Sequence, residues 1–285
     1  MTKIIFLLQS EDRKGLLSAA VNWFYGAGFN ILHCQQHTDS YENMYYMRIE
    51  LDASDMQTSR RDLEKQFSLF AEEMKFTWSC HYSDYTPRVA ILVSKTSHCL
   101  FDLISRQLEG ELKCEIPLII SNHPDLEKVA NQFRIPYYYF PVGDDKRAQE
   151  EKISDLLKRF DIDLIVLARY MQILTPKFTE EWKGKVINIH HAFLPAFQGA
   201  NPYLRAYERG VKMIGATAHY ATEDLDKGPI IEQDVVRVNH ELTPQGLKEV
   251  GKDVEKRVLA SAVKAHLENR IIIHDNRTIV FGVER

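Results

Sequence analysis

The sequence predicts an α/β protein of two domains, in which a small antiparallel βαββαβ unit is followed by a larger, mostly parallel sheet. Its 285 residues exceed the length of one typical small domain. Hydrophobic residues make up 45% and charged residues 27% of the chain, proportions that are typical of globular proteins with buried cores. The pattern of apolar runs changes near residue 88, which indicates where the second domain begins.

The first part of the chain shows strand and helix patterns in the order βαββαβ. We expect strands at 3–9, 30–38, 43–52 and 75–82, and helices at 14–27 and 57–74. In the second of these helices, Leu63, Phe67 and Phe70 form one apolar stripe. This order is that of a ferredoxin-like fold, an antiparallel sheet with both helices on one face. The first domain is therefore predicted to span residues 1–84.

From residue 88 onward, apolar strands alternate with helical segments. Strands are expected at 89–94, 114–120, 136–140, 163–169 and 185–190, and helices at 98–108, 124–133 and 145–160. Near-continuous apolar runs of this kind are typical of parallel strands buried on both faces. The polar segment 83–88, which contains Pro87, is typical of a linker between domains. We therefore predict a second, Rossmann-like domain over 88–285.

The last third of the second domain departs from this simple alternation. Two further strands, 213–221 and 229–238, flank an acidic loop, and a long amphipathic helix at 243–268 precedes a small hairpin. Ligands of open parallel sheets bind at the carboxyl ends of the strands. The segments 169–174 and 190–199 are therefore the first places to look for a site.

Composition excludes several classes of function. A net charge of −4 and an isoelectric point near 6.3 offer no cationic surface for nucleic acid. No apolar stretch approaches the roughly 20 residues that cross a bilayer, and the N-terminus has no signal-peptide cleavage site, so we expect a cytoplasmic protein without membrane contact. The cysteines are widely spaced, which favours reduced thiols over a zinc site or disulfides: Cys34, Cys80, Cys99 and Cys114.

Asn188 and His190 leave the end of a predicted buried strand and enter a loop that runs to Gly199. Because side chains alternate along a strand, both should point to the same side, where an amide donor and an imidazole could hold a carbonyl group. His191 should point to the opposite face if the strand continues. The pair could equally cap the strand and its turn, so this motif alone does not decide the chemistry.

Asp226 lies in the acidic loop, just before a Gly-Pro turn. A carboxylate there could orient a water molecule or hold a protonated His190, although Asp-x-Gly is also ordinary turn chemistry. A third segment, Ala168–Pro176, leads from a strand end into a helix that begins near Thr175 and Pro176. Its apolar residues could line a pocket or simply pack in the core.

Together these segments resemble the folate-dependent formyltransferase family, which combines N-I-H…L-P-x-F-x-G, H-x₆-D-x-G-x-I-I and Y-M-x-I-L. The resemblance implies catalytic roles for Asn188, His190 and Asp226 and a folate substrate, with neither a metal nor another cofactor. It further implies a set of substrate-binding residues: Arg169, Tyr170, Met171, Ile173, Leu174, Gly199, His219 and Gly228.

The first domain resembles the ACT domain, a small regulatory module that binds amino acids between paired copies. The runs Asp12–Ser18 and Gly28–Ile31 match its D-R-x-G…G-x-N-I pattern. The resemblance implies regulatory positions at Gly15, at a close backbone approach, and at Asn30. It also implies an amino-acid effector such as glycine or methionine, and a homo-oligomer.

An ACT-like domain ahead of a formyltransferase-type domain resembles the formyltetrahydrofolate deformylases. These enzymes hydrolyse 10-formyltetrahydrofolate to formate and tetrahydrofolate, which supplies formate for purine biosynthesis in one-carbon metabolism. The segment Ser94–Leu100 lacks the glycines that would let backbone amides cradle a substrate phosphate, and His190 through Phe193 read as in deformylases. Both features favour water over a phosphorylated amine as the formyl acceptor.

Three alternatives remain open from the sequence. The chain could transfer the formyl group to an amine such as glycinamide ribonucleotide. It could be a metal-dependent hydrolase that uses His190, His191, His219 and Asp226. It could also be chiefly an amino-acid sensor whose catalytic half is degenerate.

Overall fold

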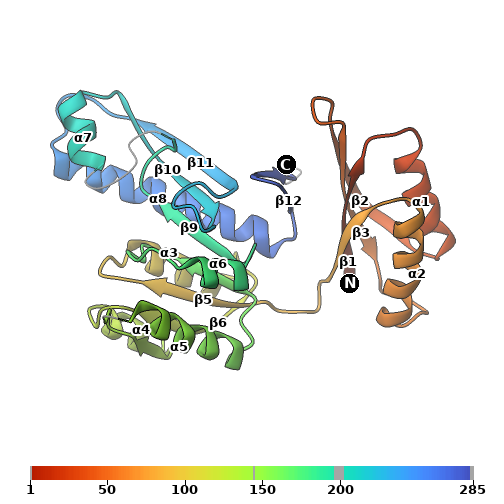
Figure 1. Ribbon diagram of the computed structural model, residues 1–285, viewed down its shortest axis with the longest axis horizontal. Helices are drawn as coiled ribbons and strands as arrows, with labels where there is room; N and C mark the ends of the chain where they lie inside the picture. Colours follow the sequence, from red (N-terminus) through yellow and green to blue (C-terminus); the bar gives the residue numbers. More distant parts are fainter. Residues whose placement is uncertain (1, 144, 196–201, 283–285) are drawn as a thin grey trace. The chain divides into compact units, whose positions relative to one another are not determined.

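The computed structural model describes residues 2–143, 145–195 and 202–282, and the chain divides into two compact units (Figure 1). Unit 1 comprises residues 2–86, 269–272 and 279–282, and unit 2 comprises 87–268 and 273–278. The first division falls inside the expected linker, but part of the C-terminal tail belongs to unit 1. The reason is apolar packing, because Ile272 and Phe281 are buried together with Ile5, Leu7 and Tyr46.

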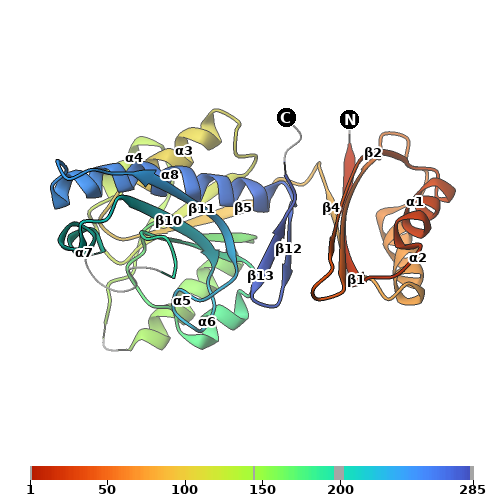
Figure 2. The same cartoon turned by 90° about the horizontal axis from the view of Figure 1, so that it is seen from above.

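Unit 1 is a four-stranded antiparallel sheet in the order β2-β3-β1-β4. Its elements follow the expected order: β1 (Lys3–Glu11), α1 (Leu16–Gly26), β2 (Asn30–Asp39), β3 (Met44–Asp52), α2 (Arg60–Glu73) and β4 (Thr77–Tyr82). Both helices cover one face of the sheet (Figures 1 and 2). An aromatic cluster joins them to the sheet, with the ring of Phe6 4.9 Å from Phe24 and 4.6 Å from Phe67. The ferredoxin-like prediction is thereby confirmed.

Unit 2 contains a seven-stranded sheet in the order β11-β10-β9-β8-β5-β6-β7. The strands are β5 (Arg88–Val93), β6 (Glu115–Ser121), β7 (Tyr137–Tyr139), β8 (Leu164–Leu167), β9 (Val186–His190), β10 (Met213–Tyr220) and β11 (Ile230–Arg237). The five strands from β5 to β9 pair in parallel, whereas β10 and β11 are antiparallel. This is the expected mostly parallel sheet. A two-stranded hairpin, β12 (Ile271–His274) and β13 (Arg277–Val280), follows.

Helices cover both faces of the unit 2 sheet (Figure 2). They are α3 (His98–Leu108), α4 (Glu127–Gln132), α5 (Lys146–Arg159), α6 (Pro176–Glu181), α7 (Pro202–Arg209) and α8 (Pro244–Leu267). On one face, Ile153 of α5 and Phe178 of α6 pack with Ala90 and Leu92 of β5. On the other face, α8 packs along β9, β10 and β11 and beside α3. Alternate side chains of each strand therefore serve two cores.

No helix within the described residues combines the length and the apolar character that a membrane span requires.

Candidate active site

A cavity of about 890 Å³ opens in unit 2 where β8 and β9 end. Five segments that lie far apart in the sequence line it: Leu167 with Arg169–Leu174, Asn188–His191, Pro202–Leu204, His219 with Ala221–Asp226, and Pro244 with Gln245 and Lys248. The parallel strands bring the first two segments to the same edge of the sheet, as expected for this class of fold. The last three segments come from α7, from the end of β10 with the loop after it, and from α8, and only the tertiary structure brings them to this edge.

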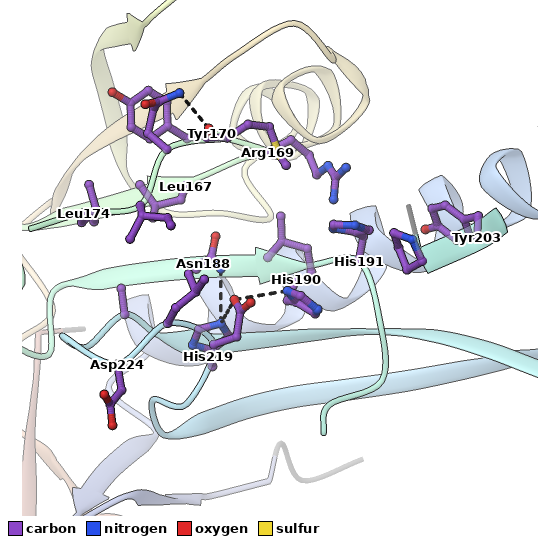
Figure 3. A pocket seen from close by; sticks show the side chains of 18 of the residues that line it. Leu167, Arg169, Tyr170, Leu174, Asn188, His190, His191, Tyr203, His219 and Asp224 are labelled. Carbon is purple, nitrogen blue, oxygen red and sulfur yellow. Dashed lines mark hydrogen bonds and ion pairs between the residues drawn. The ribbon is translucent and has the colours of Figure 1, made fainter. Parts of the chain in front are cut away.

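Asn188 and His190 project into the cavity from one side of β9, as strand alternation predicts (Figure 3). β10 runs antiparallel beside β9, and its register sets His219 directly opposite Asn188. The result is a hydrogen bond between Asn188 Nδ2 and His219 Nε2 at 3.2 Å. The imidazole of His219, which is buried, therefore fixes the orientation of the Asn188 amide.

The backbone carbonyl of Tyr220 accepts a hydrogen bond of 2.9 Å from His219 Nδ1. A carbonyl oxygen has no proton to give, so Nδ1 must carry the hydrogen. In the neutral imidazole, Nε2 is then an acceptor, and Asn188 donates to it. One N–H of the Asn188 amide is thereby used, and the second can donate to a ligand in the cavity.

Asp226 completes this cluster from the loop between β10 and β11. Its Oδ1 lies 3.2 Å from His190 Nδ1 and 3.6 Å from His219 Nε2. Burial alone would raise the pKa of Asp226, but the hydrogen bond to His190 is the largest opposing influence, and the pKa lies well below its usual range. The carboxylate is therefore ionised at neutral pH. It favours the hydrogen of His190 on Nδ1, which leaves Nε2 able to accept a proton.

His190 Nε2 is buried and has no hydrogen-bond partner among the described residues. Because buried polar atoms are normally paired, an unpaired nitrogen in a cavity calls for an explanation. A group in the cavity that donates a proton to this nitrogen, or receives one from it, would supply the missing partner.

Gly228 allows the loop to carry Asp226 into place. A Cβ atom at this position would lie 1.8 Å from the backbone oxygen of Tyr220, at the end of β10. Any other residue must push the loop away from the strand. Asp226 itself has a positive φ of 57°. The loop conformation that presents its carboxylate therefore depends on both residues.

The 169–174 segment forms a largely apolar wall of the cavity, with Met171 and Ile173 exposed and Tyr170 buried. Two buried polar side chains hold the segment at its ends. The backbone N–H of Met171 donates to Ser94 Oγ at 2.9 Å, and that of Thr175 donates to Glu150 Oε1 at 3.1 Å. The glycine-free segment after β5 thus supports this wall through Ser94.

His191 also lines the cavity, which corrects the expectation that it would point away from His190. β9 ends at His190, so side-chain alternation stops there, and the two rings stack with centroids 5.1 Å apart. Burial lowers the pKa of His191 to about 3, and the charges of Arg169 and His190 act in the same direction. His191 is therefore neutral at physiological pH.

Glu255 of α8 is the centre of a second polar cluster, which the sequence patterns did not predict. Its carboxylate accepts from Tyr203 Oη at 2.7 Å, lies 2.8 Å from His98 Nε2 and 3.5 Å from Arg169 Nε. Burial alone would raise the pKa of Glu255, but His98, Arg169 and Tyr203 outweigh burial and lower it. A signal was available, since a Glu on the apolar face of a predicted amphipathic helix requires buried partners.

His98, Cys99 and Glu255 place potential metal ligands within 4.8 Å of one another, the one such group of three within the described ranges. The chemistry of the group does not favour a cation. Arg169 already brings a positive charge to Glu255, and burial, followed by the charge of Glu255, raises the pKa of the Cys99 thiol well above its usual value. We assign no metal to these residues.

Comparison with known proteins places this geometry in a family. The Formyl transferase family matches residues 87–263 of the chain. The formyltetrahydrofolate deformylase of Synechocystis sp. is 50% identical over 277 residues, which cover 97% of each chain. This chain belongs to the formyltetrahydrofolate deformylase family.

Solved structures agree with membership of the deformylase family. The crystal structure of a formyltetrahydrofolate deformylase from Pseudomonas syringae pv. tomato has a TM-score of 0.96 and 42% identity, and the match covers 99% of this chain and 95% of that one. The phosphoribosylglycinamide formyltransferase of Anaplasma phagocytophilum is more distant, with a TM-score of 0.65 and 32% identity. That match covers 97% of the formyltransferase but only 70% of this chain.

Not all of the site residues predicted from the sequence line the cavity. Most of the predicted site residues line one cavity: Arg169, Tyr170, Met171, Ile173, Leu174, Asn188, His190, His219 and Asp226. Gly228 supports the loop instead, and Gly199 lies outside the described residues. His219 was expected to bind substrate, and its described contacts are to Asn188, Asp226 and Tyr220.

The two predicted regulatory residues, Gly15 and Asn30, lie in unit 1. Gly15 precedes α1 with a φ of 94°, and Asn30 is the first residue of β2. The nearest atom to a Cβ at Gly15 would be Ser18 Oγ at 3.9 Å. Backbone conformation therefore explains the glycine.

Proposed function

We propose that this chain hydrolyses 10-formyltetrahydrofolate to formate and tetrahydrofolate, with water as the formyl acceptor. The observation that carries the proposal is the contact between His190 Nδ1 and Asp226 Oδ1, next to the Asn188 amide in one cavity. This is a general base with its orienting carboxylate beside a hydrogen-bond donor. Membership of the deformylase family supports water rather than an amine as the second reactant.

The first step is the attack of water on the formyl carbon. His190 Nε2 takes a proton from the water as the new C–O bond forms, and the ionised Asp226 stabilises the resulting imidazolium. The free N–H of Asn188 donates to the oxyanion that develops on the formyl oxygen. His219 contributes by keeping the Asn188 amide in the donating orientation.

The second step is the collapse of the tetrahedral intermediate. The C–N10 bond breaks, and the imidazolium of His190 returns its proton to N10, which leaves as the amine of tetrahydrofolate. The formic acid that remains loses its proton to solvent and leaves as formate. One water is consumed and one proton is released, so the imidazole of His190 is unchanged after each turnover.

The apolar wall at 169–174 supports a role in folate binding. Exposed Met171 and Ile173 face the cavity beside Leu174, and such surfaces suit the flat ring of a pterin. We propose that Arg169, Tyr170 and these three residues contact the folate, and that Gly228 acts through the loop that carries Asp226.

The decisive experiment mixes the purified protein with 10-formyltetrahydrofolate and no other acceptor, and follows formate and tetrahydrofolate. The proposal expects one formate for each tetrahydrofolate, and the same rate in the presence of a metal chelator. If formate were absent and the formyl group moved only after glycinamide ribonucleotide was added, the protein would be a transferase. If chelation abolished turnover and a metal ion restored it, the metal-free mechanism would be wrong.

We further propose that unit 1 binds an amino-acid effector at a site near Gly15 and Asn30, and that the chain forms a homo-oligomer. The antiparallel sheet with two helices on one face supports an ACT-like module. Calorimetry with glycine and with methionine, run beside the turnover assay, tests the effector, and analytical ultracentrifugation tests the assembly. If neither amino acid gave a heat of binding, the effector proposal would be wrong. If the protein were a monomer at assay concentration, the homo-oligomer proposal would be wrong.

A further inference from the structure

Arg169 brings a positive charge to the cavity that the hydrolytic steps above do not use. Its backbone lies just after β8 with a φ of 66°, in the left-handed region, and its side chain lines the cavity. The side chain is 13% exposed, and its Nη1 atom is buried without a hydrogen-bond partner among the described residues. A buried guanidinium donor without an acceptor is costly, so a missing partner is expected.

Glu255 anchors the guanidinium but does not satisfy it. The 3.5 Å contact joins the carboxylate to Nε alone, and the same carboxylate also accepts from Tyr203 and contacts His98. Its capacity as an acceptor is thus shared among three neighbours. Nη1 of Arg169 has no acceptor among the described residues, and a guanidinium can bind a carboxylate with two parallel hydrogen bonds.

Arg169 lines the same cavity as Asn188, His190 and Asp226. His191 lies near both side chains, because its ring stacks on His190, and the charge of Arg169 adds to burial in lowering the pKa of His191. Figure 3 shows the Arg169 side chain extending toward His191, on the side of the cavity that Tyr203 also borders. His191 is neutral, so it adds no competing charge at this end of the cavity.

We propose that the Arg169 guanidinium is a product subsite that binds the carboxylate of formate as it forms. The inference rests on the proposed function, because only hydrolysis creates a small carboxylate at this point. The acceptor that Nη1 lacks is supplied when C–N10 cleavage leaves a formic acid molecule that loses its proton to solvent. Arg169 then holds the anion away from N10, which disfavours the reverse reaction.

The test measures inhibition by each product separately, at constant ionic strength, with sodium chloride replacing sodium formate in the control. In Arg169→Met, the inhibition constant for formate should rise about tenfold or more, since charge-assisted hydrogen bonds are the strong class. The inhibition constant for tetrahydrofolate should rise by a clearly smaller factor, because Tyr170 and the apolar residues of the 169–174 segment keep their proposed contacts with the folate. Arg169→Lys keeps the positive charge but loses the planar pair of donors, or fork. Its inhibition constant for formate should therefore lie between those of the unmodified protein and Arg169→Met.

Two further variants distinguish recognition by the Arg169 fork from a general effect of positive charge and from a loss of folding. Lys248→Met removes a lysine from the lining of the same cavity, and it should leave formate inhibition within about twofold if the fork of Arg169 is what matters. Removing Arg169 alone takes a positive charge away from the buried carboxylate of Glu255, which could prevent folding. The double variant Arg169→Met with Glu255→Gln removes both charges, and its inhibition constant for formate should also rise about tenfold or more.

Three results would overturn the inference. They are an unchanged inhibition constant for formate, an equal rise for both products, and an equal effect of Lys248→Met. Failure of the proposed function is distinguishable, because the unmodified protein would then release no formate without an amine acceptor.

Discussion

Replacement of Asp226 by Asn keeps the size of the side chain and removes its charge. Oδ1 of Asp226 lies 3.2 Å from His190 Nδ1. Two unit charges at that distance interact by about 5 kcal/mol at an effective dielectric constant of about 20. This is the stabilisation that an imidazolium on His190 would lose, and at about 1.4 kcal/mol per tenfold change it corresponds to slightly less than four decades in rate. We expect kcat to fall by about 10³ to 10⁴.

The assay is formate release from 10-formyltetrahydrofolate without an acceptor, measured over a range of substrate concentrations. Because Asp226 acts through His190 rather than on the folate ring, KM should stay within about threefold of the unmodified protein. Asp234→Asn is the matched control. Asp234 lies on β11, pairs with Arg257 at the surface and does not line the cavity, so its loss should change kcat by less than about twofold. A kcat for Asp226→Asn within tenfold of the unmodified protein would refute the reasoning.

Three other changes test the geometry around this site. Gly228→Ala places a Cβ atom 1.8 Å from a backbone oxygen, so we expect kcat to drop at least about tenfold as the loop shifts, and a normal rate would show that the loop tolerates the methyl group. His191→Gln tests a pH effect. The folded-state pKa of His191 lies at about 3, below its ordinary 6.5, so the unfolded chain binds the extra proton and stability is lost as pH falls from about 6.5 toward 3. Urea unfolding at pH 7 and pH 5 should therefore show a smaller loss in the variant, by up to about 1.4 kcal/mol per pH unit, and equal losses would contradict the burial of a neutral imidazole. Gly251→Ala would put a Cβ atom 2.1 Å from Tyr203 Oη and should cost about 1–3 kcal/mol in thermal unfolding. Gly246→Ala on the same helix should cost less, because its Cβ atom would lie 3.2 Å from the end of the Leu242 side chain. Equal melting temperatures for these two variants would show that Tyr203 can move aside without loss.

The order and type of most helices and strands could be read from the sequence because they depend on local periodicity, whereas α7 was not predicted. Side-chain alternation predicted that Asn188 and His190 lie on one side of β9. This prediction did not require knowledge of the neighbouring strands, because alternation is a property of a single strand. The same argument failed for His191. Alternation holds only within a strand, and the end of β9 at His190 is set by its pairing with neighbouring strands.

Long-range packing decided the rest of the site. The opposition of Asn188 and His219 follows from the antiparallel register of β9 and β10, and pairing register has no signature within either strand alone. Glu255 likewise meets Arg169 only because α8 packs on the same sheet.

The sequence by itself determined which elements form and which residue types their ends carry, since backbone propensity and side-chain period are properties of short segments. Only the tertiary structure decided which charges meet. Electrostatic coupling between His190 and Asp226, or between Arg169 and Glu255, falls steeply with distance and burial, and neither quantity exists until the elements have packed.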